Sequence, residues 1–148
     1  MILGLLLHIF AATVWVGGMF FAHVVLRPAS AALEPALRLP LMRRVLARYF
    51  PWVWGSIAML LLTGYGMISL GVNGLHVQLM QLIGIIMMLT FAHLYFVPWR
   101  RFQRTLDAGD LPAAAKHMAQ IRAIVTMNLA LGLVVIALGA TGRYWHWG

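Results

Sequence analysis

The sequence contains no cysteine and only three acidic residues. Without cysteine, the chain can have no disulfide bonds, no thiolate metal ligands and no thiol redox chemistry. Charged residues make up 9% of the chain, whereas they make up about 25% of a typical soluble domain. The composition therefore excludes an ordinary soluble domain, because apolar residues take the place of most of the charged residues that such a domain would contain.

Apolar residues make up 63% of the chain and concentrate in four long runs. A helix needs roughly 20 apolar residues to cross a hydrocarbon core about 30 Å thick. The runs predict membrane spans at about residues 2–26, 49–71, 75–97 and 123–141. The opening residues lack the basic stretch of a signal peptide, so the first run is expected to stay as a span. Residues 1–148 are thus predicted to form one domain, an all-α, antiparallel four-helix bundle integral to the membrane.

Ten of the eleven basic residues lie between the first and second runs or between the third and fourth. Because loops rich in arginine and lysine stay in the cytoplasm, both loops are predicted to be cytoplasmic. Both termini are then expected on the other side of the inner (plasma) membrane. This topology, together with contact to anionic lipid, explains the formal net charge of +8, so no nucleic-acid partner is needed.

Local signals in the connections predict where helices stop and start. Pro28, Pro35 and Pro40 are expected to break the helix before the second span. Residues 71–74 (GVNG) predict a tight turn, so the second and third spans form a hairpin. Asp110 is placed to cap a helix with Pro112 in its first turn, and this helix is expected to run into the last span.

The first span carries two histidines in a run without charged residues. At 100° per residue, one face of this helix holds His8, Ala12, Trp15, Met19 and His23. An imidazole without a partner is costly in lipid, so this face is expected to point into protein or towards a cofactor.

The third span adds His76 near its outer end and His93 near its cytoplasmic end. Because the spans alternate in direction, depths can be compared at about 1.5 Å per residue. This comparison predicts two layers of side chains: His23, His93 and Asn128 on the cytoplasmic side, and His8, Met67 and His76 on the outer side.

Two antiparallel helices with histidines at matched depth can ligate one haem iron between them. His8 is the predicted axial ligand of haem b, with one of His93, His76, His23 or Met67 opposite it. His76 and His93 are 17 residues apart and point about 100° away from each other, which favours one haem over two. Alternatively, the same histidines form only structural hydrogen bonds between helices.

Three stretches within about the first hundred residues resemble known membrane families. HIFAATVWVGG, followed by MFF, resembles the first-helix pattern of the copper-resistance D (CopD) family and of the HemJ-type protoporphyrinogen oxidases. RYFPWVWGSIAMLLLTGYGMI resembles the second helix of CopD-like proteins, and LHVQL with AHLYF is similar to the third helix of the HemJ type. The resemblance implies a small four-helix membrane protein.

The same resemblance implies roles for particular residues. The family's first-helix and third-helix histidines match His8 and His76, which implies that they ligate haem b. The HemJ-type lysine two residues later is Gln78 here, and a glutamine cannot supply the positive charge of lysine. The CopD resemblance implies copper passage or handling, with an outer metal site formed by His8, His76, Met19 and Met67.

Three functions follow from these observations. The first is an inner-membrane haem b protein for one-electron transfer with quinone or a membrane redox protein, and thus an oxidoreductase whose chemistry belongs to the cofactor. The second is CopD-like copper transport, and the third is a structural membrane subunit. The lipid bilayer is a partner in all three, and the sequence leaves a homo-oligomer open.

Overall fold

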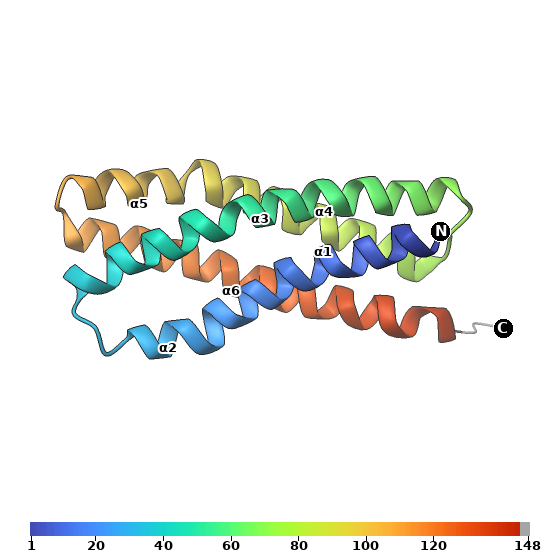
Figure 1. The fold of residues 1–148 in the computed structure, drawn as a ribbon, viewed down its shortest axis with the longest axis horizontal. Helices are drawn as coiled ribbons and strands as arrows, with labels where there is room; N and C mark the ends of the chain where they lie inside the picture. Colours follow the sequence, from blue (N-terminus) through green and yellow to red (C-terminus); the bar gives the residue numbers. More distant parts are fainter. Residues whose placement is uncertain (146–148) are drawn as a thin grey trace.

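Four long helical segments run antiparallel in the computed structural model, which describes residues 1–145 (Figure 1). The segments consist of α1 (Ile2–Phe20) with the π-helical turn η1 (Phe21–Leu26) and α2 (Arg27–Ser30), then α3 (Pro35–Ser69), then α4 (Leu75–Phe96) with α5 (Pro98–Asp107), and finally α6 (Leu111–Thr141) with the 3-10 turn η2 (Gly142–Tyr144). No strand occurs within residues 1–145. The all-α four-helix bundle predicted from the sequence is confirmed.

Each of the four segments is long and apolar enough to cross a membrane. They contain between 29 and 35 residues, and none has more than two charged side chains in its most apolar window of 18 residues. Their outer surfaces carry large apolar side chains, including Leu62, Leu89 and Phe10, that would be exposed in water. The chain is therefore a multi-pass membrane protein.

The helices extend well beyond the predicted spans at one end of the bundle. Helix α3 begins at Pro35 and α6 at Leu111, whereas the corresponding spans were predicted to begin near residues 49 and 123. Figure 1 places α2, α5 and the turns at residues 31–34 and 108–110 at this end, which we call the basic end. The N-terminus, the turn after α3 and the end of α6 lie at the opposite, terminal end.

The prediction that Pro28 and Pro40 break the helix is wrong. Pro28 is the second residue of α2, which follows η1 directly, and the wide π-helical turn of η1 accommodates a residue without a backbone N–H. Pro40 lies inside α3 and would have bonded the carbonyl of Ala36, an exposed residue whose carbonyl water can satisfy. Only Pro35 marks a true boundary, because it occupies the first turn of α3.

The predicted hairpin turn and the predicted helix cap are confirmed. Gly71 and Gly74 adopt φ values of +92° and +138°, which the hairpin between α3 and α4 requires and which side chains disfavour. Gly109 has φ +73° in the turn between α5 and α6. Asp110 then caps α6, since its side chain accepts a hydrogen bond of 3.0 Å from the backbone N–H of Ala113.

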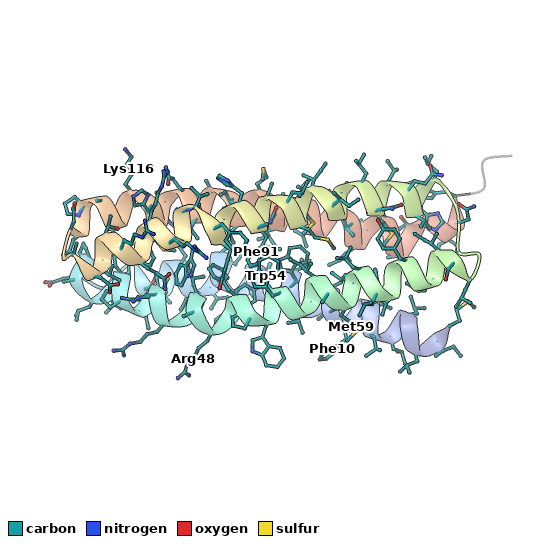
Figure 2. The ribbon with its side chains drawn as sticks, turned by 90° about the horizontal axis from the view of Figure 1, so that it is seen from above. Phe10, Arg48, Trp54, Met59, Phe91 and Lys116 are labelled. Atoms are coloured by element: carbon teal, nitrogen blue, oxygen red, sulfur yellow. The ribbon has the colours of Figure 1, made fainter. Side chains whose placement is uncertain are left out.

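Aromatic side chains fill the space between α3 and α4. Trp54 and Phe91 face each other inside the bundle, with ring centroids 5.3 Å apart, whereas Arg48 and Lys116 point away from it (Figure 2). Phe50 packs edge-on against both Phe91 and Trp99, at 5.4 Å and 5.0 Å between centroids. This cluster connects the middle of the bundle with its basic end and accounts for much of the core.

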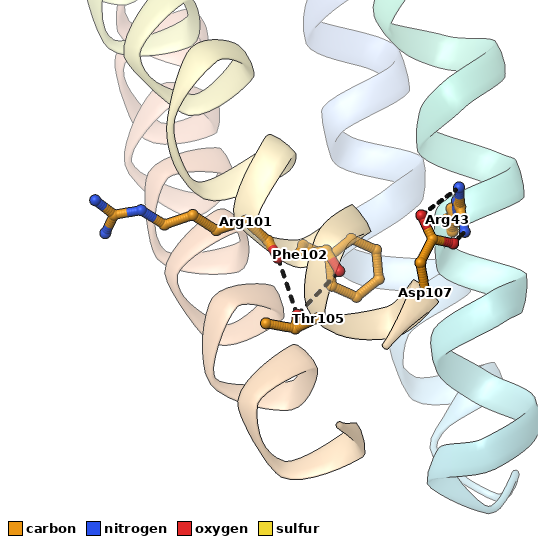
Figure 3. Close-up of polar contacts among 5 residues, drawn as sticks. All are labelled: Arg43, Arg101, Phe102, Thr105 and Asp107. Carbon is orange, nitrogen blue, oxygen red and sulfur yellow. Dashed lines mark hydrogen bonds and ion pairs between the residues drawn. The ribbon is translucent and has the colours of Figure 1, made fainter. Parts of the chain in front are cut away.

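A polar contact joins α3 to α5 at the basic end (Figure 3). The guanidinium of Arg43 forms an ion pair with the carboxylate of Asp107. Nearby, the Thr105 hydroxyl donates to the carbonyls of Arg101 and Phe102, and the Phe102 ring is fully buried. The basic end is thus a packed part of the bundle and not a pair of loose loops.

Candidate functional site

The face of α1 that the sequence predicts to be buried points into the bundle. Trp15 and Met19 are each 2% exposed, and His8 and His23 are half-buried. The two histidines, however, contact different helices, since His8 bonds Thr63 of α3 and His23 bonds Thr126 of α6.

His8 packs against α3. Its Nδ1 lies 2.8 Å from the Thr63 hydroxyl oxygen, and its ring lies beside Gly64, where a Cβ would come within 3.3 Å of Cε1. Gly64 therefore makes room for the imidazole at the contact between the two helices. A porphyrin between α1 and α3 at this depth would require these helices to separate.

The predicted outer layer is divided between two contacts. Met67 lies one turn beyond Thr63 on α3, near Gly4 of α1, and so lines the same α1–α3 contact as His8. His76 lies elsewhere, because its ring packs against Gly142 at the end of α6 and beside Gly74. His8 and Met67 are thus brought together along one contact, and His76 is not part of it.

The predicted cytoplasmic layer is also divided. Asn128 is buried and bonded to α4, since it accepts from the Thr90 hydroxyl at 2.7 Å and donates to the Met87 carbonyl at 3.2 Å. His23 instead lies 3.1 Å from the Thr126 hydroxyl, and His93 is exposed on the outside of α4. No hydrogen bond joins two histidines in the described part of the chain, and the three members of this predicted layer do not contact one another through hydrogen bonds.

The four residues predicted to bind copper do not converge either. His8 and Met19 are eleven residues apart on α1, about 16 Å along the helix axis, so one ion does not bind both. Among residues 1–145, no group of three His, Cys, Asp or Glu side chains lies close enough to hold a metal ion. Of the four residues, His8 and Met67 are the two that line the same contact between α1 and α3.

Comparison with protein-family models, characterised proteins and solved structures finds no match. The resemblance to the CopD and HemJ-type families stays a prediction.

A cavity of about 240 Å³ opens between three of the four helical segments at the basic end. We call it the arginine cavity, because Arg27 of α2, Arg38 of α3 and Arg122 of α6 line it. His23 and Ser30 also line it, and its walls are otherwise apolar, formed by Ala22, Leu26, Ala31, Leu39, Met42, Val45, Leu46, Ala115, Met118, Ile121 and Val125.

Helical spacing explains how these side chains reach one cavity. His23, Arg27 and Ser30 are separated by four and three residues, which places them on one side of the helical path through η1 and α2. Arg38 shares a face with Met42 on α3, and Arg122 shares a face with Met118 on α6, both at a separation of four residues. Because Met42 and Met118 belong to the buried core, the two arginines on their faces are directed inward.

The charge in the arginine cavity is uncompensated within the described part of the chain. None of its lining residues is acidic, and no hydrogen bond or ion pair engages the guanidinium groups of Arg27, Arg38 or Arg122. The charges of Arg27 and Arg38 also repel that of Arg122. By contrast, Arg43, which lines a second hollow between α3 and the turn from α5 to α6, is paired with Asp107. Three like charges against an apolar wall form an environment suited to an anion.

His23 supplies the one imidazole of the arginine cavity. Its Nδ1 is engaged with the hydroxyl of Thr126, which leaves Nε2 as the nitrogen that can bind a ligand. η1, which carries His23, is π-helical, and such segments occur often at functional sites. The same groups would suit haem b, because an imidazole nitrogen can bind its iron, guanidinium groups can bind its propionates, and apolar walls can enclose its macrocycle. The cavity is nevertheless smaller than the roughly 300 Å³ at which ligand pockets begin, so a macrocycle would require η1 and α6 to separate.

His23 was predicted from the sequence as a site residue, but the three arginines were not, because all basic residues between the spans were attributed to topology and lipid contact. The available signal was the spacing of Arg38 and Arg122 from core methionines. For Arg38, that signal depends on α3 beginning before Pro40, and Pro40 was expected to break the helix.

Proposed function

We propose that this protein binds an anionic amphiphile from the membrane in the arginine cavity. The observation that supports the proposal is the convergence of three unpaired guanidinium groups with an apolar wall, contributed by three separate segments. Arg27 is exposed and Arg38 and Arg122 are half-buried, and the three like charges repel one another, so a ligand that supplies negative charge stabilises this arrangement. An apolar part of the same ligand would replace water along the walls.

The depth of the arginine cavity agrees with a ligand that has a charged head and an apolar body. Its lining crosses the predicted membrane boundary, with His23 and Val125 inside the first and fourth spans and the three arginines beyond them. A charged head would therefore lie at the level of the lipid head groups. By the positive-inside rule, we propose that this end faces the cytoplasm and that the membrane is the inner membrane.

Haem b belongs to the proposed ligand class, because it combines an apolar macrocycle with two carboxylates. In this version His23 would hold the iron, and Arg27 and Arg38 would hold the carboxylates. Bound haem supplies one-electron chemistry, with quinone or a membrane redox protein as the partner. His8, the ligand predicted from the sequence, would have no part in it.

Copper handling is the second candidate, and the shared α1–α3 contact of His8 and Met67 favours it. An imidazole and a thioether are suitable ligands for Cu(I). This candidate uses the terminal half of the bundle and leaves the arginine cavity unexplained.

Native mass spectrometry of the protein purified in mild detergent tests the proposal. We expect the wild-type protein to retain a bound anionic amphiphile. The double variant Arg38→Gln/Arg122→Gln should retain at least about tenfold less, because two of the three charges in the arginine cavity are lost. The matched control is Arg101→Gln/Arg104→Gln, which removes two exposed charges of α5 outside the cavity and should behave like wild type.

The visible spectrum and the metal content of the same preparations identify the ligand. A Soret band that is lost in His23→Ala and kept in His93→Ala would support the haem version. Stoichiometric Cu(I), lost in His8→Ala and without any anionic amphiphile, would overturn the proposal in favour of copper. Equal retention of the amphiphile by both double variants would also overturn it.

A further inference from the structure

The positive charge of the arginine cavity narrows the class of anionic amphiphile that it fits. Resting on the function proposed above, we infer that the ligand is a lipid with a phosphate monoester head group. The inference depends on three observations: how many charges line the cavity, from how many directions they come, and what surrounds them.

The number of charges favours a dianion over a monoanion. Arg27, Arg38 and Arg122 bring three positive charges, and no acidic side chain lines the cavity. A phosphodiester lipid or a fatty acid carries one negative charge and would leave two guanidinium groups unneutralised. A phosphate monoester carries about −1.5 to −2 at pH 7, because its second pKa is about 6. It therefore neutralises most of the charge with one head group.

The arrangement of the arginines favours a phosphate over a single carboxylate. The three guanidinium groups come from α2, α3 and α6, which surround the cavity and do not share one face. A guanidinium presents a planar fork of donors that binds two oxygens at once. A phosphate monoester offers three terminal oxygens in different directions, so that separate arginines can each find an acceptor. A lone carboxylate offers two oxygens in one plane.

The walls of the arginine cavity favour a lipid over free phosphate. Eleven apolar residues line it, and Val125 and Ala22 continue it into the predicted spans. A volume of about 240 Å³ accommodates a head group and the adjoining glycerol, while the acyl chains would lie in the bilayer. Inorganic phosphate would leave the apolar wall in contact with water, so its binding would lack the favourable free energy of removing that apolar surface from water.

Native mass spectrometry with defined lipids tests this inference on the delipidated protein. The probes are phosphatidic acid, phosphatidylglycerol and phosphatidylcholine with identical acyl chains, and inorganic phosphate alone. We expect affinity for phosphatidic acid about tenfold above that for phosphatidylglycerol at pH 7.5, since one additional charge interacts with nearby guanidinium groups under partial screening. In Arg38→Gln/Arg122→Gln this preference should fall to about twofold or less, and Arg101→Gln/Arg104→Gln should keep it.

The outcomes separate this inference from the proposed function. Equal affinity for phosphatidic acid and phosphatidylglycerol, both well above phosphatidylcholine, overturns the phosphate monoester and leaves the anionic amphiphile standing. Equal affinity for all three lipids overturns both. A copurified haem lost in His23→Ala overturns the phosphate monoester alone. Displacement of phosphatidic acid by equimolar inorganic phosphate shows that the lipid body contributes nothing and overturns the assignment of a lipid.

Discussion

At the scale of single residues, Gly18 allows Tyr49 to lie directly on the backbone of α1. A Cβ at Gly18 would come within 2.3 Å of the Tyr49 ring. The Tyr49 hydroxyl donates a hydrogen bond to the carbonyl of Trp15, which fixes the ring in place. The close approach of α1 and α3 therefore depends on the absence of one side chain.

We expect Gly18→Ala to destabilise the protein by about 1–3 kcal/mol, because the added methyl forces the Tyr49 ring and its hydrogen bond to shift. Gly17→Ala is the matched control, since nothing lies within 4 Å of its Cβ position. It should leave stability unchanged or raise it by up to about 1 kcal/mol through better helix propensity. Unfolding in mixed micelles followed by circular dichroism measures both. Equal stabilities of the two variants would contradict the close contact.

For the first helix, the sequence predicted which side chains are buried but not which residues the histidines contact. Helix phase correctly placed Trp15 and Met19 inside, because phase is a local property of one helix. The partners of His8 and His23 could not be predicted, because Thr63 and Thr126 belong to helices 55 and 103 residues away in sequence. Matched depth alone does not determine which faces of two helices meet.

At the scale of helices, two neighbouring acidic residues have different structural roles. Asp110 caps the long helix α6, and Asp107 forms an ion pair with Arg43 across to α3. A cap satisfies a backbone N–H that has no partner within the helix. An exposed ion pair gains little, because water screens both charges.

Asp110→Ala should therefore cost about 0.5–2 kcal/mol of stability. Asp107→Ala should cost at most about 1 kcal/mol, since the two paired side chains are 35% and 61% exposed. The free energy of unfolding at low and high salt checks both values. The effect of Asp107→Ala should diminish in salt, whereas a larger loss for Asp107→Ala than for Asp110→Ala would show that this end is held mainly by the ion pair.

The prolines show why helix boundaries were predicted less well than helix cores. Pro40 and Pro51 both lie inside α3, although proline removes a backbone hydrogen bond. The carbonyls they leave without a partner belong to Ala36 and Ala47, which are exposed. Whether a proline breaks a helix thus depends on the surroundings of the residue four positions earlier, and those surroundings are set by tertiary packing.

At the scale of the whole molecule, the four segments are longer than a membrane requires. Helix α3 contains 35 residues, which is about 50 Å at 1.5 Å per residue. A hydrocarbon core is about 30 Å thick, so roughly 20 Å of α3 extends beyond it. Because basic residues are concentrated at that end, we expect the protruding part of α3 to lie on the cytoplasmic side of the membrane.

Labelling of single-cysteine variants tests this orientation, and the native chain is suitable because it has no cysteine. Asn73→Cys lies in the turn at the terminal end, and Ala108→Cys lies in the turn at the basic end; both residues are exposed. A membrane-impermeant maleimide added to intact cells should label Asn73→Cys. Ala108→Cys should react only after the membrane is permeabilised. The reverse pattern would invert the topology and place the arginine cavity on the outer side.

The sequence by itself determined the four spans, their alternation and the gathering of positive charge at one end. It could do so because a chain in lipid must satisfy its backbone hydrogen bonds within each helix, so that every span is encoded in its own 20 or so residues. The tertiary structure alone decided that Arg27, Arg38 and Arg122 line one cavity while His8, His76 and His93 separate. These positions depend on how helices far apart in the chain pack against one another, and the π-helical turn η1, the two internal prolines of α3 and close contacts at glycine set that packing.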